Sequence, residues 1–149
     1  MTKLLGAIVF LAVVPPASDV PHAHPLNNQA EIESEYGPRM HPVLHQRQMH
    51  RGVDFRVDKG TPVYATAAGF VKVVAEDDKY GKFIVVDHGE GYTTLYAHLE
   101  KQLAAEGAEI ASGAQIGTTG NSGLSRKPHL HYEVRLHDES QDPEAYLPK

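Results

Sequence analysis

The sequence predicts a mainly β protein that folds as one domain. The chain has 149 residues, of which 41% are hydrophobic, enough for one compact core and too few for a second. From residue 61 onward, short runs rich in valine, isoleucine, threonine and tyrosine alternate with glycine, asparagine or aspartate, the pattern of successive strands. We therefore expect strands over residues 63–66, 70–76, 83–87, 92–98 and 129–136.

The N-terminal residues have the composition of a secretory signal. Lys3 precedes an apolar run over residues 4–14, and small residues follow. We expect residues 1–18 to be a signal peptide, cleaved at a point as late as residue 23, and the protein to be secreted to the periplasm or cell surface. Because a membrane-spanning helix needs roughly 20 apolar residues, we expect no stable membrane span.

Residues 19–30 contain two prolines and paired asparagines, which favour a flexible arm. The folded domain is then expected to occupy residues 31–149. Helix is expected only over residues 99–106 and 143–146.

Alternation of side chains along a strand predicts which residues share a face. In the last strand His129 and His131 point to one side, and the residues of the other parity are apolar. In the strand over residues 92–98, the same alternation predicts a polar face that ends in His98, with Leu95 and Ala97 facing inward. Three histidines are thus expected to line one groove.

Composition excludes some classes of partner and site. A net charge of -5 gives no basic field for nucleic acid, and the absence of cysteine excludes disulfides and thiolate metal ligands. The 10 histidines direct attention to metal binding and proton transfer. We expect a monomer.

A further candidate for metal binding lies upstream of these histidines. His50 and Asp54 would share one face of an extended segment, with Gly52 between them leaving space for an ion. Glycine beside the β-branched Val53 is unfavourable in a helix, so this is not the helical pair of histidines around a glutamate. A catalytic zinc ion needs three nitrogen or oxygen ligands and an open position for water.

Several separated motifs, in this order, resemble the M23 family of LytM and lysostaphin-like metallopeptidases. They are Tyr36-Gly37-Pro38-Arg39, His41-Pro42-Val43, His50 to Asp54, Gly60-Thr61-Pro62-Val63-Tyr64-Ala65, Tyr92 to Leu99, Ile116-Gly117 and Pro128-His129-Leu130-His131-Tyr132-Glu133-Val134. The resemblance implies the duplicated hybrid motif fold, in which an antiparallel sheet forms the floor of a groove holding one zinc ion. It also implies hydrolysis of peptide bonds in bacterial peptidoglycan.

The resemblance assigns the site residue by residue. It implies zinc bound by His50, Asp54 and His131, with His98 and His129 as the catalytic residues beside the metal. One of these two histidines would be the general base and proton donor, and the other would stabilise the oxyanion; the sequence leaves both assignments open.

Three basic residues are candidates for the substrate groove. Arg126 and Lys127 fall where the family more often has small residues, and they either attract carboxylates of stem peptides or form an exposed basic loop. Arg39 either binds substrate or pairs with a buried carboxylate.

Two functional alternatives follow from the same motifs. Family members that cut glycine bridges tend to have a tyrosine shortly before the first ligand, and this chain has none over residues 45–49, which favours D-alanyl bonds. The alternative to an enzyme is a non-catalytic module of the same fold that binds peptidoglycan or activates an amidase.

Overall fold

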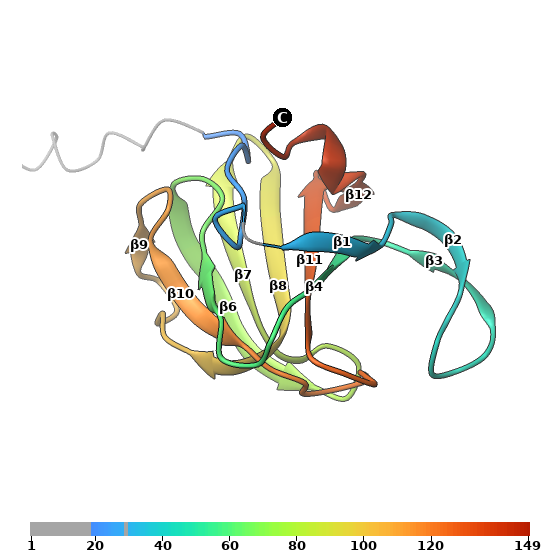
Figure 1. The fold of residues 1–149 in the computed structure, drawn as a ribbon. Helices are drawn as coiled ribbons and strands as arrows, with labels where there is room; N and C mark the ends of the chain where they lie inside the picture. The colour runs from blue at the N-terminus through green and yellow to red at the C-terminus, as the bar shows by residue number, and fades with distance from the viewer. Residues whose placement is uncertain (1–18, 29) are drawn as a thin grey trace, which may run out of the picture.

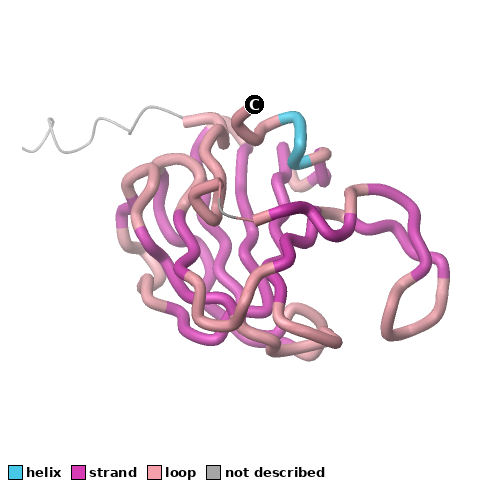
Figure 2. The backbone as a smooth tube through the Cα atoms, viewed as in Figure 1, coloured by secondary structure: helices cyan, strands magenta, loops and turns pink. Residues whose placement is uncertain are grey.

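The structure is a computed structural model that describes residues 19–28 and 30–149. Strands make up most of it, with one short helical turn near the C-terminus (Figure 2). The expected signal peptide lies outside the described residues. Within the described ranges, no helix is long and apolar enough to cross a membrane. The elements are β1 (Glu31–Ser34), β2 (Gly37–Met40), β3 (Arg47–His50), β4 (Val53–Arg56), β5 (Pro62–Tyr64), β6 (Gly69–Asp77), β7 (Gly81–Gly89), β8 (Tyr92–Gln102), β9 (Glu109–Ile110), β10 (Gln115–Thr119), β11 (His129–Leu136), β12 (Glu139–Gln141) and the 3₁₀ helix η1 (Pro143–Ala145).

One antiparallel sheet contains ten of the strands. Its main path runs β1-β4-β11-β8-β7-β6-β9, while β10 pairs with β5 and β8, and β12 pairs with β11. Strands β2 and β3 form a separate hairpin that projects from the body of the protein (Figure 1). The mainly β, antiparallel architecture expected from the sequence is confirmed.

The strands expected from the sequence are found, and one expected helix is wrong. The strand expected over residues 129–136 has the bounds of β11. The segment 99–106 is not helical: β8 continues to Gln102, because its end pairs with β10 through Gly117. The expected terminal turn is η1, which Asp142 caps by accepting a hydrogen bond from the backbone N–H of Glu144.

The core is formed by apolar residues that alternate along the strands. One buried cluster contains side chains from β4, β5, β6, β7, β8, β10 and β11, including the fully buried Tyr96 and Tyr132. A smaller cluster of Val85, Leu95 and Ala97 lies apart from it. Since transfer of apolar area from water drives folding, these two clusters hold the sheet together and fix the position of β11 and β8.

Residues 19–28 are packed, and the expectation of a flexible arm is wrong for them. Leu26 is 1% exposed and belongs to the main core. The backbone N–H of Tyr64 donates to the carbonyl oxygen of Pro25, and that of Ala23 donates to the carbonyl oxygen of Thr66. One buried leucine and regular backbone hydrogen bonds compensate for the proline-rich composition, so the folded unit begins before residue 31.

Candidate metal centre and its groove

The candidate metal centre lies where β4 pairs with β11. His131 lies opposite Asp54 in the antiparallel register, so both side chains leave the same face of the sheet. His50 is the last residue of β3 and reaches the same point. All three are buried, with exposed fractions of 5% for His50, 6% for Asp54 and 7% for His131. The structure thus brings together the three residues that the sequence proposed as metal ligands.

Gly52 allows the segment between β3 and β4 to lie close against β11. An added Cβ atom would overlap the carbonyl oxygen of Tyr132 and would lie 2.9 Å from Cγ of Glu133. The expectation that Gly52 leaves space for an ion is therefore wrong, because β11 occupies that space. Its lack of a side chain allows the chain to pass from β3 into β4 directly against β11.

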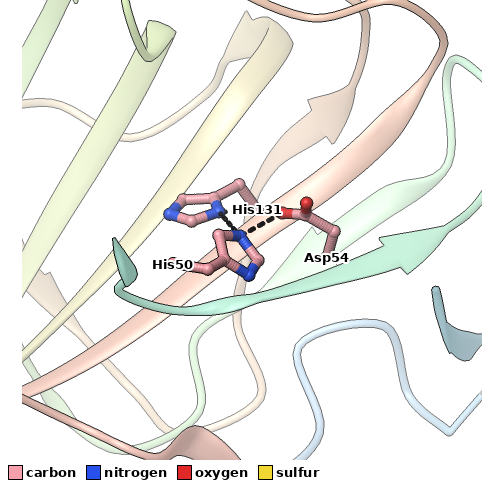
Figure 3. Close-up of side chains that lie close together, drawn as sticks. All are labelled: His50, Asp54 and His131. Carbon is pink, nitrogen blue, oxygen red and sulfur yellow. Dashed lines mark hydrogen bonds and ion pairs between the residues drawn. The ribbon is translucent and has the colours of Figure 1, made fainter. Parts of the chain in front are cut away.

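The donor atoms of the three residues converge on one point (Figure 3). Nε2 of His50 lies 3.2 Å from Oδ1 of Asp54 and 3.3 Å from Nδ1 of His131. Nδ1 of His131 lies 2.8 Å from the same carboxylate oxygen. Among the described residues, this is the one group of three or more histidine and carboxylate side chains with metal-binding geometry, its donor atoms all within 4.8 Å of one another.

Hydrogen bonds on the far side of each imidazole decide which nitrogen faces the centre. Nδ1 of His50 lies 2.8 Å from the carbonyl oxygen of Glu35, and Nε2 of His131 lies 2.7 Å from Oε2 of Glu133. These oxygens only accept hydrogen bonds, so the nitrogens that face them carry the hydrogens. In neutral rings, the lone pairs of the other two nitrogens then point at each other and at Asp54, which is repulsive unless a proton or a metal cation lies between them. Two imidazoles and a carboxylate suit zinc, and the buried histidine–glutamate pair is the usual support of a zinc-bound imidazole.

The charges at the centre also favour a cation. Burial raises the pKa of Asp54, but hydrogen bonds from His131 and His50 outweigh burial and hold that pKa well below its usual range. Burial lowers the pKa of His131, while its hydrogen bonds to Asp54 and Glu133 raise it to about 9. A proton on His131 and a metal ion therefore satisfy the same need for positive charge next to Asp54.

His129 lies beside the centre on the same face of β11 as His131. Nε2 of His129 is 3.7 Å from Oδ1 of Asp54. On the other side of the ring, Nδ1 lies 2.9 Å from the carbonyl oxygen of Lys127 and 3.1 Å from the hydroxyl of Ser125. The carbonyl takes the hydrogen on Nδ1, so in the neutral ring the nitrogen that faces the centre, Nε2, has the free lone pair.

His98 reaches the same region through a bulge in β8. Lys82 of β7 pairs with Leu99, whereas Ile84 pairs with Tyr96, so β8 has one extra residue between these pairs. His98 has a φ of 61°, in the left-handed region that side chains other than glycine rarely adopt. An extra residue with this conformation re-aims a side chain at the edge of a regular ladder.

The alternation expected for this strand is therefore wrong. Tyr96 is fully buried in the main core, whereas Leu95 and Ala97 belong to the other cluster, and Ala97 lies opposite His131. Under strict alternation His98 would follow Tyr96 into the core. The bulge places it on the side of His131. The sequence therefore predicted the position of His98 in the groove, but from a regular alternation that this strand does not have.

The loop before β11 fixes the ring of His98. Nδ1 of His98 donates to the carbonyl oxygen of Ser122 at 2.6 Å, and the ring centroid lies 4.6 Å from that of His129. The loop comes this close because Gly123 packs on Gly81, where an added Cβ would overlap the backbone nitrogen. Burial, followed by the neighbouring His129, lowers the pKa of His98 to about 4, so the ring is neutral.

A groove surrounds these histidines. Its walls are the β2–β3 hairpin on one side and the segments around residues 79–80 and 124–126 on the other, and His129, His131 and Asp54 lie along it. A second hollow continues from Asp54 and His129 toward Glu33 and Ser34 of β1. An extended peptide laid along both hollows would pass directly over the metal centre.

The three basic residues expected at the groove all line it. Arg39 forms an ion pair with the carboxylate of Asp54, with Nη2 3.6 Å from Oδ2. Its Nη1 donates to the hydroxyl of Ser34 at 3.0 Å. This is the carboxylate pairing that the sequence left open as one of two roles.

Arg126 and Lys127 reach opposite walls of the groove. Nη1 of Arg126 donates to the carbonyl oxygen of Pro42 in the hairpin loop at 3.1 Å. Nζ of Lys127 lies 2.7 Å from Oε1 of Glu33. Both residues are exposed, and each contacts a partner on a different wall of the groove.

Sequence reasoning missed the residues that support the centre. Glu133 has the same parity as His129 and His131 in the last strand, but the sequence suggested no role for it; it is 1% exposed and accepts a hydrogen bond from Nε2 of His131. Tyr80 and Ser122 act on the site from loops, through a hydroxyl and a backbone carbonyl. Alternation could have found Glu133, and no sequence pattern marks the other two.

Comparison with known proteins agrees with the arrangement of the site. Residues 48–143 match the model of peptidase family M23. The DD-carboxypeptidase/endopeptidase Mpg of Neisseria meningitidis serogroup B is 41% identical over 112 residues, which cover 75% of this chain and 26% of that protein. This chain thus spans about a quarter of that relative.

Solved structures of two similar peptidases have the same fold. A zinc-containing peptidase from Vibrio cholerae superposes with a TM-score of 0.76 at 34% identity, covering 85% of this chain and 39% of that one. The catalytic domain of the antimicrobial peptidase lysostaphin from Staphylococcus simulans has a TM-score of 0.73 at 30% identity, covering 80% of this chain and 92% of that one. The sequence match, the fold and the buried histidine–aspartate–histidine cluster together show that this chain belongs to peptidase family M23.

Proposed function

We propose that the protein is a zinc-dependent endopeptidase that hydrolyses peptide bonds of bacterial peptidoglycan, with one zinc ion held by His50, Asp54 and His131. The observation that carries the proposal is the convergence of three lone pairs on a point that opens to a groove, with two further imidazoles beside it. A purely structural metal site would be closed by a fourth protein ligand. Here the fourth side is left to water and substrate.

His98 and His129 are proposed to move the protons. When bound, zinc supplies a water that is acidic at neutral pH and polarises the carbonyl to be cleaved. Each of the two rings donates its Nδ1 hydrogen to a backbone carbonyl, so the neutral ring has its lone pair on Nε2. An unprotonated Nε2 can accept the proton of the attacking water and return it to the leaving amine. We assign this work to the pair jointly.

D-alanyl bonds are the proposed target within peptidoglycan. The Neisseria relative is named for DD-carboxypeptidase and endopeptidase activity, and residues 45–49 lack the tyrosine that favours glycine bridges. Digestion of two purified walls tests the choice, one cross-linked directly through D-alanine and the other through glycine bridges. Release of fragments from the glycine-bridged wall alone would refute the proposed bond.

The groove is proposed to recognise carboxylates of the stem peptides through Arg126 and Lys127. Both side chains line the hollow next to Asp54, and their present partners, a backbone carbonyl and an exposed ion pair, are weak enough to exchange for substrate. In an Arg126→Ala, Lys127→Ala double variant, we expect KM for stem peptides to rise several-fold with little change in kcat. Unchanged kinetics would refute the role.

The central test measures zinc content together with digestion of purified peptidoglycan. We expect about one zinc ion in the wild type, loss of zinc in His131→Ala, and full zinc with lost activity in His129→Ala. His137→Ala is the matched control, because this exposed histidine lies just beyond the other end of β11. Thermal unfolding of each variant identifies any loss that comes from misfolding.

The alternative is a non-catalytic module that binds peptidoglycan or activates an amidase. A wild-type protein that binds zinc and releases no fragment from any wall would favour this alternative, and capture of an amidase would then be the next experiment.

Secretion to the periplasm or cell surface belongs to the same proposal. Fractionation of cells that express the protein tests it.

A further inference from the structure

Tyr80 stands between β6 and β7 and lines the groove. Its ring stacks on that of His131, with centroids 5.7 Å apart and planes inclined by 29°. Its backbone carbonyl accepts a hydrogen bond from the N–H of His98 at 2.8 Å. One residue outside the proposed ligand set therefore contacts both a proposed ligand and a proposed catalytic histidine.

The hydroxyl of Tyr80 completes a buried hydrogen-bond network. It donates to Oε2 of Glu133 at 2.7 Å, and the same oxygen accepts from Nε2 of His131 at 2.7 Å. Arg135 donates twice to the other oxygen, at 2.9 and 2.6 Å. Hydrogen bonds therefore occupy both carboxylate oxygens of Glu133.

We infer that Tyr80 is a positioning residue for the metal centre: its hydroxyl fixes the carboxylate of Glu133, and that carboxylate fixes the ring of His131 with Nδ1 toward the metal. The inference rests on the proposed function, since it assigns His131 as a zinc ligand. A carboxylate that supports a metal-bound histidine must be held in place to be effective, and here the tyrosine holds the oxygen that histidine uses.

The hydroxyl can be tested apart from the rest of the residue. Tyr80→Phe keeps the ring over His131 and the backbone contact to His98, and it removes the hydrogen bond to Glu133 together with the longer one from Arg135 at 3.4 Å. Loss of a direct supporting partner weakens metal binding 10- to 100-fold, and for a partner one step further away we expect about 3- to 10-fold. The measurement is the zinc Kd of the full chain by competition with a chromophoric chelator.

A double-variant cycle separates positioning from a merely structural role. Glu133→Gln should weaken zinc binding more than Tyr80→Phe does, and in the Glu133→Gln background the added effect of Tyr80→Phe should fall below about 2-fold. Tyr92→Phe is the matched control, because its hydroxyl faces that of Tyr146 at 3.5 Å and Tyr92, the first residue of β8, is not among the residues that line the groove.

The outcomes are distinguishable. A zinc Kd in Tyr80→Phe that stays within about 2-fold of the wild type overturns the inference and leaves the proposed function intact. Equal weakening in the wild-type and Glu133→Gln backgrounds also overturns it, since the tyrosine would then act by another route. A wild type that binds no zinc overturns the proposed function and this inference with it.

Discussion

Truncation of Leu26 tests whether residues 19–28 belong to the folded unit. This side chain is 1% exposed and packs in the main core. Leu26→Ala removes three carbons, worth about 0.8 kcal/mol each on transfer from water, and leaves a cavity, so we expect a loss of about 3 kcal/mol in the free energy of unfolding. For a domain of this size, that corresponds to a fall in Tm of about 10 °C.

Urea denaturation of the zinc-loaded protein, followed by circular dichroism, measures the loss. Leu103→Ala is the matched control, because Leu103 is 55% exposed and the same substitution there should change stability by less than about 0.5 kcal/mol. If the two variants are equally stable, residues 19–28 do not pack as described.

Three further outcomes follow from the structure. Gly52→Ala should abolish tight zinc binding, because the new Cβ would overlap the carbonyl oxygen of Tyr132 and displace Glu133; zinc content after gel filtration checks this. Removal of zinc with EDTA should lower Tm, since a ligand present at about 1,000 times its Kd stabilises by about 4 kcal/mol; calorimetry with and without EDTA measures it, and an unchanged Tm would contradict a buried metal site. Burial lowers the pKa of His88 from 6.5, so the unfolded state binds a proton more readily and stability should fall as pH drops below about 6.5; a His88→Gln variant should lose less stability between pH 7 and pH 5 in urea titrations.

The sequence predicted the part of the site that lies on regular strand. His129 and His131 share a face in β11 because that strand has no irregularity across the ladder to β4, so alternation alone places both side chains. His50 and Asp54 were also grouped correctly, although they lie on two strands with a break between them. Pattern reasoning succeeds where the backbone is regular and the partner strand imposes no correction.

The rest of the site depends on features that have no local signal. A bulge in β8 places His98, and a hydroxyl from a distant loop supports Glu133. Similarly, Leu26 packs against the main core. The proline and asparagine content of residues 19–28 gives no information about this tertiary contact. Tertiary contacts overrode local composition in each case.

Because of the bulge in β8, the position of the His98 side chain depends on the number of residues in the strand as well as on their identity. Deletion of Leu99 would restore an ordinary ladder with His98 opposite Lys82, and it would return the imidazole to the side of Tyr96, in the main core. Such a deletion would disturb the sheet less than it would disturb the arrangement of the histidines at the groove.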